Sequence, residues 1–204
     1  MSLYKQTQLQ LILTLVLVLA FVLQFKAIMP IEGALFPSGD LSHASLLFIP
    51  HGLKMLAAYL LGIIAAPAIF VAQLFAGLFV LGVNAQDAAV GALFGTIAAI
   101  APVTLLNFMF KNNRSDGVAM NTKVGIGTFR AFIVAVILST FINSILHSAY
   151  FFDGGSITLP FRYLFGDMMG ALLVFGLVIL MRRQILSFIA RRISAWFKSL
   201  SKYR

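Results

Sequence analysis

The apolar run from Ala44 to Val83 constrains this chain more than any other feature. Its only charged side chain is that of Lys54. A helix needs about 20 apolar residues to cross a bilayer, so the run is long enough for two crossings. The whole chain agrees, since 61% of its 204 residues are hydrophobic and 10% are charged, against about 25% charged in soluble domains. The sequence therefore predicts an integral membrane protein in contact with the lipid bilayer.

The apolar runs are continuous rather than alternating, which favours an all-α, polytopic helix bundle over a β-barrel. Prolines and polar turns divide the sequence into about six spans. Pro67 sets one boundary, because the residue before a proline is pushed out of helical geometry. We expect the spans at about Leu9–Met29, Leu46–Ala66, Pro67–Val83, Ala88–Phe110, Phe129–Tyr150 and Phe161–Met181.

The pattern changes after Met181, so the chain divides into a transmembrane domain, 1–181, and a basic segment, 182–204. Apolar residues recur in the second part at helical spacing, while its basic residues avoid that stripe. This predicts an amphipathic helix on the inner leaflet, where anionic lipid attracts it. The stripe consists of Ile185, Ile189, Ile193, Trp196 and Leu200.

The distribution of charge predicts the orientation. Basic residues cluster at the N-terminus, in the connection 111–130 and at the C-terminus, which lie on one side if six spans alternate. Basic loops stay in the cytoplasm, so both termini should be cytoplasmic. The net charge of +9 thus has a topological explanation, and nucleic acid is not an expected partner. The acidic residues Glu32, Asp40, Asp87 and Asp153 then lie outside.

The start of the second span combines residues that are unusual in lipid. Pro50, His51, Gly52 and Lys54 occur within five positions. Proline favours the first turn of a helix, so we expect a helix to begin near Pro50, below the membrane surface. Free amides at a helix start attract anions, and Lys54 adds positive charge. The alternative is a proline-initiated helix whose glycine packs closely.

Further polar residues share this depth. Asn143 and His147 lie on one polar face of the fifth span together with Ser139, and Asp167 lies about two turns into the sixth span. Lys54 and Asp167 carry opposite charges in an apolar surrounding, so we expect them to form an ion pair, directly or through a ligand. A purely structural pair is the alternative. The predicted ligand-binding residues are Pro50, His51, Gly52, Lys54, Asn143, His147 and Asp167.

Enzyme motifs do not occur in the sequence. It contains no serine-hydrolase elbow, zinc-protease helix, phosphate loop or dinucleotide fingerprint. The chain has no cysteine, and the spacing of His51, His147 and Asp167 is not that of a metal site. We therefore expect a protein that is not an enzyme and holds neither metal nor cofactor.

Two stretches resemble the membrane-associated sensor (MASE-type) family of bacterial receptors. Pro50-x-Gly52-Leu53, followed by Ala57-Ala58, Gly62 and Pro67, is similar to the family's proline–glycine helix start. Gly166-Asp167-x-x-Gly170 is similar to the Gly-Asp-x-x-Gly of its last membrane helix. The resemblance implies a bacterial inner-membrane module that senses a small ligand or envelope signal, with Pro50, Gly52 and Asp167 at its site. Such sensors have about eight spans and an output domain, so this shorter chain would signal through a separate partner.

Taken together, these features predict recognition of a small polar or anionic ligand, or of an envelope signal, in a pocket in the outer half of the membrane. The signal would pass to a partner protein. Two other functions fit the size and span count. One is the substrate-binding subunit of a vitamin-type uptake transporter, and the other is an accessory or assembly subunit of a larger membrane complex.

Overall fold

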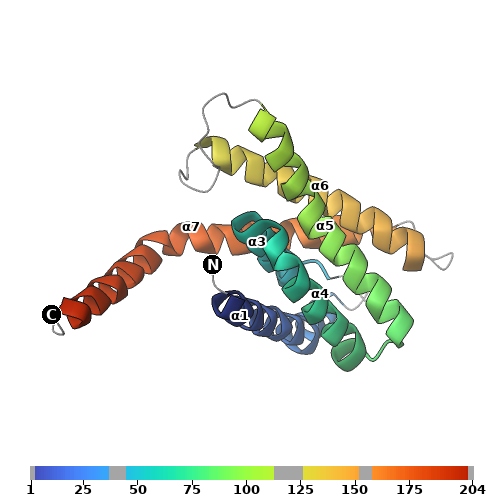
Figure 1. Cartoon of the computed structure of the whole chain (residues 1–204). Coiled ribbons are helices and arrows are strands. Elements are labelled where there is room, and N and C mark those ends of the chain that lie inside the picture. Colours follow the sequence, from blue (N-terminus) through green and yellow to red (C-terminus); the bar gives the residue numbers. More distant parts are fainter. Residues whose placement is uncertain (1–2, 37–44, 113–125, 152–157, 202–204) are drawn as a thin grey trace.

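The computed structural model describes residues 3–36, 45–112, 126–151 and 158–201, and these are helical apart from short connections (Figure 1). Past Met181 it describes the backbone alone. Five helical runs are long and apolar enough to cross a membrane, where the sequence predicted six. The all-helical class is therefore confirmed, with five runs that are long and apolar enough to span a membrane, but the predicted count of six spans is not. The runs are Gln6–Leu35, Ile49–Leu81, Ala85–Met109, Arg130–Tyr150 and Pro160–Met181.

The first run extends beyond its predicted end at Met29. Helix α1 (Leu3–Leu23) passes through a π-helical turn, η1 (Gln24–Ile28), into α2 (Met29–Leu35). Pro30 lies in the first turn of α2, where its missing amide hydrogen disrupts little, and the wider π-turn precedes it. Pro30 and Glu32, predicted to lie in a loop, are therefore helical. Residues 37–43 of that loop lie outside the described residues.

The second run contains both the second and the third predicted spans. It consists of α3 (Ile49–Leu61), the 3₁₀ turn η2 (Gly62–Ala65), α4 (Ala66–Phe75) and the π-helical η3 (Ala76–Leu81). The break lies at Gly62, with φ 60° and ψ −139°, and not at Pro67. Pro67 instead occupies the first turn of α4, where a proline is tolerated.

The chain folds back at Gly62. The Lys54 amine donates a hydrogen bond to Gln73 Oε1 at 2.9 Å, whereas a straight helix would separate two residues 19 positions apart by about 28 Å. Helices α3 and α4 are therefore two arms joined at Gly62. Gly62 adopts a left-handed φ that side chains other than glycine's rarely accept, which explains why the turn occurs there.

The remaining helices follow the expected order with longer bounds. Helix α5 (Ala85–Asn112) contains Pro102, as predicted, and α6 (Ile126–Phe151) begins before the predicted fifth span. Helix α7 (Thr158–Ser201) continues without a break past Met181. The backbone therefore shows one continuous helix and not a separate surface helix. The position of the last part of α7 on the membrane surface stays a prediction. The loops at 113–125 and 152–157 lie outside the described residues.

Helix α3 lies at the centre of the bundle. It packs against α7, α1, α5 and α6, while α4 fills the space between α1 and α5. Met55 and Ala58 of α3 are fully buried with Leu17, Ile69 and Ala99 in one apolar core. In Figure 1 the end of α5 and the start of α6 lie toward the same side as both termini. Because these helices surround α3, its polar side chains are enclosed by protein.

Candidate functional site

A non-helical segment, Ser45–Phe48, leads into α3 and lies across α7. The Phe48 amide donates to the Gly166 carbonyl oxygen at 2.9 Å. A side chain at Gly166 would overlap the Ser45 carbonyl, and one at Gly170 would overlap that of Phe48. The two glycines of Gly-Asp-x-x-Gly therefore make room for non-helical backbone beside α7. This packing role is one that the spacing alone did not indicate.

The side chains of Gln24, Glu32 and Ser45 hold this segment in place. They were not predicted as a group. Both carboxylate oxygens of Glu32 accept backbone amides, from Leu46 at 3.1 Å and from Leu47 at 3.0 Å. The Ser45 hydroxyl donates to Glu32 at 2.7 Å and accepts from the Gln24 amide at 2.9 Å. Gln24 and Glu32 lie eight positions apart on one helix face, and that spacing is the signal that could have revealed them.

The start of α3 is less open to an anion than predicted. The Ile49 amide donates to Gln24 Oε1 at 3.0 Å, and the His51 amide donates to the Phe48 carbonyl oxygen at 3.2 Å. Pro50 has no amide hydrogen. Gly52 packs so closely on Gly170 that a side chain would meet the Gly170 carbonyl. Pro50 and Gly52 thus shape the helix start and the α3–α7 contact, and their part in ligand binding stays a prediction.

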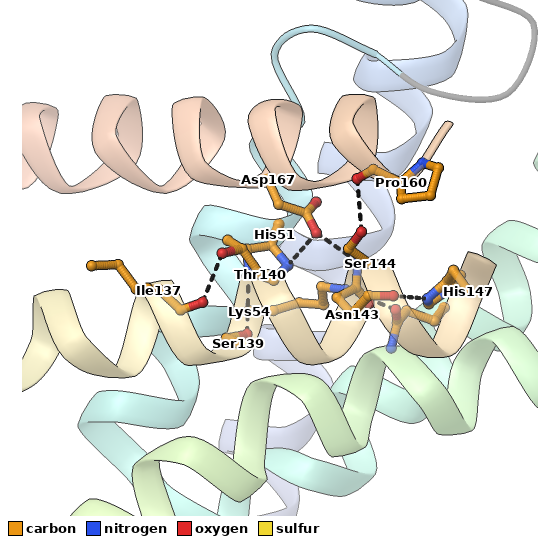
Figure 2. Close-up of polar contacts among 11 residues, drawn as sticks. His51, Lys54, Ile137, Ser139, Thr140, Asn143, Ser144, His147, Pro160 and Asp167 are labelled. Carbon is orange, nitrogen blue, oxygen red and sulfur yellow. Dashed lines mark hydrogen bonds and ion pairs between the residues drawn. The ribbon is translucent and has the colours of Figure 1, made fainter. Parts of the chain in front are cut away.

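The other predicted site residues do come together (Figure 2). His51 of α3 lies between α6 and α7, with its Nδ1 atom 3.4 Å from Asp167 Oδ2. Its Nε2 atom shares a hydrogen bond of 3.2 Å with Ser139 Oγ. The Asn143 side-chain amide donates to the same Asp167 oxygen at 2.6 Å. Asp167, His51 and Asn143 are all at least 97% buried, because exposed fractions are 1%, 0% and 3%.

The predicted ion pair between Lys54 and Asp167 is not formed directly. Within the described part of the chain, the ion pair shorter than 4 Å that involves Asp167 is the one with His51. Lys54 is 1% exposed, and its amine donates to Gln73 of α4 instead. Gln73 in turn donates to the Ala92 carbonyl oxygen at 3.2 Å. The neutral amide of Gln73 thus binds the buried ammonium of Lys54, and Asp167 contacts His51 and Asn143 instead.

His147 lies one turn beyond Asn143 on α6 and is half-buried. Its Nδ1 atom donates to the Asn143 backbone oxygen at 3.0 Å. Its ring contacts those of Phe94 and Tyr163, at centroid distances of 5.9 Å and 5.7 Å. His147 therefore connects the buried residues with the end of α6.

Two buried polar atoms of this cluster lack a hydrogen bond. They are His51 Nδ1, which faces Asp167 without adequate hydrogen-bond geometry, and the Asn143 side-chain oxygen. Buried polar atoms are nearly always paired in native proteins, so each unpaired one calls for an explanation. We name the group His51, Lys54, Gln73, Ser139, Asn143 and Asp167 the polar cluster.

The chemistry of the polar cluster is limited by its enclosure. Asp167, His51 and Ser139 are ordered as in a serine-hydrolase triad, but Ser139 is 0% exposed and has no room beside it for a substrate carbonyl. An open groove in the described part of the chain lies elsewhere, along α5 and the Gly62 turn, with an apolar lining that includes Ile63, Ile100 and Leu105. Among the described residues, no three His, Asp or Glu side chains are grouped to hold a metal ion.

Comparison with protein-family models, curated proteins and solved structures found no match to this chain.

Proposed function

We propose that this multi-pass membrane protein recognises a small polar or anionic ligand, or an envelope signal, at the polar cluster and relays it to a partner protein. The observation that carries the proposal is the burial of Lys54, His51 and Asp167, each at most 1% exposed, inside an apolar bundle. Ionisable groups in such surroundings are costly and mostly serve function. The unpaired atoms His51 Nδ1 and Asn143 Oδ1 support it, because a polar ligand would satisfy them.

The connection between the cluster and the bundle supports a relay. The Lys54–Gln73 bond joins the two arms that meet at Gly62, so a ligand that draws the Lys54 ammonium away releases one arm from the other. Helix α3 also contacts α1, α5, α6 and α7. A displacement of α3 therefore changes its packing against every long helix that it touches. In this proposal α3 has two positions, and ligand binding favours one of them.

Both termini lie in the cytoplasm in this proposal, and the cluster lies in the outer half of a bacterial inner membrane. The fold-back at Gly62 supports this orientation, because two arms in place of one straight span leave an even number of passes. Basic residues then fall on the inner side in each of their three clusters. The sensor-family resemblance supports the same reading, with Asp167 as a shared position.

Native mass spectrometry of gently extracted protein tests the proposal, since it reports bound ligand and bound partner together. We expect a small molecule on the wild type that is lost in Lys54→Met. Lys26→Met is the matched control, because Lys26 is exposed, and it should retain the molecule. Circular dichroism shows whether both variants remain helical. If folded Lys54→Met and Lys26→Met carry the same ligand, the polar cluster is not the recognition site.

The same measurement separates the alternatives. A coupling subunit with ATPases among the co-purified proteins favours a transporter subunit, whereas a kinase or cyclase favours sensing. A stoichiometric protein partner without any small molecule favours the accessory subunit.

A further inference from the structure

We infer that His51 and Asp167 together bind a proton that arrives from the end of the bundle where α6 ends, so that acidity on that side is a signal for this protein. The inference rests on the proposed function and specifies the chemistry of its site. It starts from the 3.4 Å approach of His51 Nδ1 to Asp167 Oδ2. His51 Nδ1 is a fully enclosed polar atom without a hydrogen bond, and it faces a carboxylate.

The surroundings of His51 accept a proton on either ring nitrogen. A proton on Nδ1 faces Asp167, and a proton on Nε2 faces the Ser139 hydroxyl at 3.2 Å. The Ser139 hydroxyl can donate to a neutral ring or accept from a charged one, because a hydroxyl does both. The hydroxyls of Thr140 and Thr104 bond instead to their own helix backbone, and that of Ser144 donates to the Pro160 carbonyl oxygen of α7. Ser139 is thus held for His51.

Charged and titratable groups approach His51 from three helices. Lys54 lies one turn along on α3, Asp167 faces it from α7, and His147 lies beyond Asn143 on α6. Tyr163 of α7 lies against His147, and α4 contributes the neutral Gln73. With a neutral His51, one carboxylate balances one ammonium. A proton on His51 adds a second positive charge to this enclosed group and therefore favours a rearrangement of α3.

Polar groups connect the pair with one end of the bundle. Asn143 bonds Asp167, His147 bonds the Asn143 backbone, and Figure 2 shows these residues in sequence along α6 toward its end. Tyr150, one turn farther, is 39% exposed and its hydroxyl donates to Asp87 at 3.2 Å. Short rearrangements of such groups, with water, carry a proton between the end of α6 and Asp167.

The opposite direction is closed by aromatic packing. The rings of Phe132 and Phe175 stack at 3.8 Å, and Tyr59 meets Phe132 edge-on at 5.0 Å. Residues 131–138 of α6 and 168–181 of α7 include no polar side chain. A proton bound at His51 therefore has no polar route onward along these helices. This arrangement fits a site that reads acidity on one side.

Infrared difference spectroscopy of the full chain in lipid nanodiscs tests the inference, with pH stepped between about 8 and about 5, the range in which histidine senses pH. In the wild type we expect an imidazole signal and a buried-carboxyl signal that change together. Asp167→Asn should lose the carboxyl signal, and His51→Gln should lose the imidazole signal. Lys26→Met, at an exposed position outside this path, should retain both.

The wild-type spectrum keeps the test decisive even if a variant does not fold. A wild-type spectrum without coupled imidazole and carboxyl changes in this range overturns the proton site. Ligand binding at Lys54 is tested separately, by the mass spectrometry described above. An imidazole change that stays coupled to the carboxyl change in folded His51→Gln also overturns the proton site. Coupled signals in a chain with no ligand or partner support the proton site while removing the relay of the proposed function.

Discussion

The amine of Lys54 lies 2.9 Å from the side-chain oxygen of Gln73, although the two residues are 19 positions apart in one helical run. This bond shows that the run folds back on itself at Gly62. It also gives the buried ammonium a neutral partner, so Asp167 remains available to His51. The opposite charges of Lys54 and Asp167 are therefore in the same cluster without direct contact.

Substitution of Lys54 or Gln73 alone should lower the free energy of unfolding more than substitution of both together. Gln73→Met leaves the Lys54 ammonium enclosed without its acceptor, and we expect a loss of about 1–3 kcal/mol in the free energy of unfolding. The double variant Lys54→Met with Gln73→Met removes the unpaired charge as well and should recover part of that loss. Thermal unfolding in detergent, followed by circular dichroism, compares the variants. A double variant with the summed loss of the two single variants would contradict the pairing.

Gly62→Ala should strain the turn between α3 and α4. The residue has φ 60° and ψ −139°, a conformation essentially restricted to glycine, and the cost is about 1–3 kcal/mol. The space around Gly62 is open, so a steric clash is not the cause. Gly33→Ala is the control, because Gly33 also has open space but ordinary helical geometry. A Gly62→Ala melting temperature equal to that of Gly33→Ala would show that the turn does not need glycine.

The sequence predicted the all-helical class and the common depth of the polar residues in three spans, because both depend on local composition and position. Long uncharged runs require transmembrane helices, and polar residues within them must face the protein interior. His51, Asn143 and Asp167 were placed at one depth from their positions in three spans, and the structure brings them together. Helical rise alone is enough for that inference.

The partners of these residues were not predictable from depth. Lys54 bonds Gln73 because the fold-back at Gly62 turns α4 toward α3, a matter of helix rotation that charge matching does not capture. Pro67 was the more conspicuous break in the sequence, yet it fits the first turn of α4. Likewise Glu32 was assigned to a loop, since the π-turn that keeps the helix going past Pro30 has no clear sequence pattern.

Glu32→Gln should loosen the non-helical segment Ser45–Phe48 before α3. Each carboxylate oxygen of Glu32 accepts a backbone amide, so an amide side chain would turn an NH₂ group toward one of these donors. We expect a loss of about 1–3 kcal/mol in the free energy of unfolding. Asp87→Asn, an acid-to-amide change at the surface, should cost less than about 1 kcal/mol. Hydrogen exchange at Leu46 and Leu47 provides a local measurement, and unchanged protection of these amides would disprove the role of Glu32.

Gly170→Ala should separate α7 from the chain that crosses it, whereas Gly176→Ala on the same helix should not. A Cβ atom at position 170 would overlap the Phe48 carbonyl, and Phe48 cannot retreat without losing its hydrogen bond to Gly166. Such overpacking costs about 1–3 kcal/mol. Position 176 has open space, so alanine there should be neutral or stabilise α7 by up to about 1 kcal/mol. Melting temperatures of both variants in one detergent decide the matter. Equal shifts would mean that the close packing of Ser45–Phe48 on α7 does not require glycine at position 170. The approach of His51 to Asp167 would then need another cause.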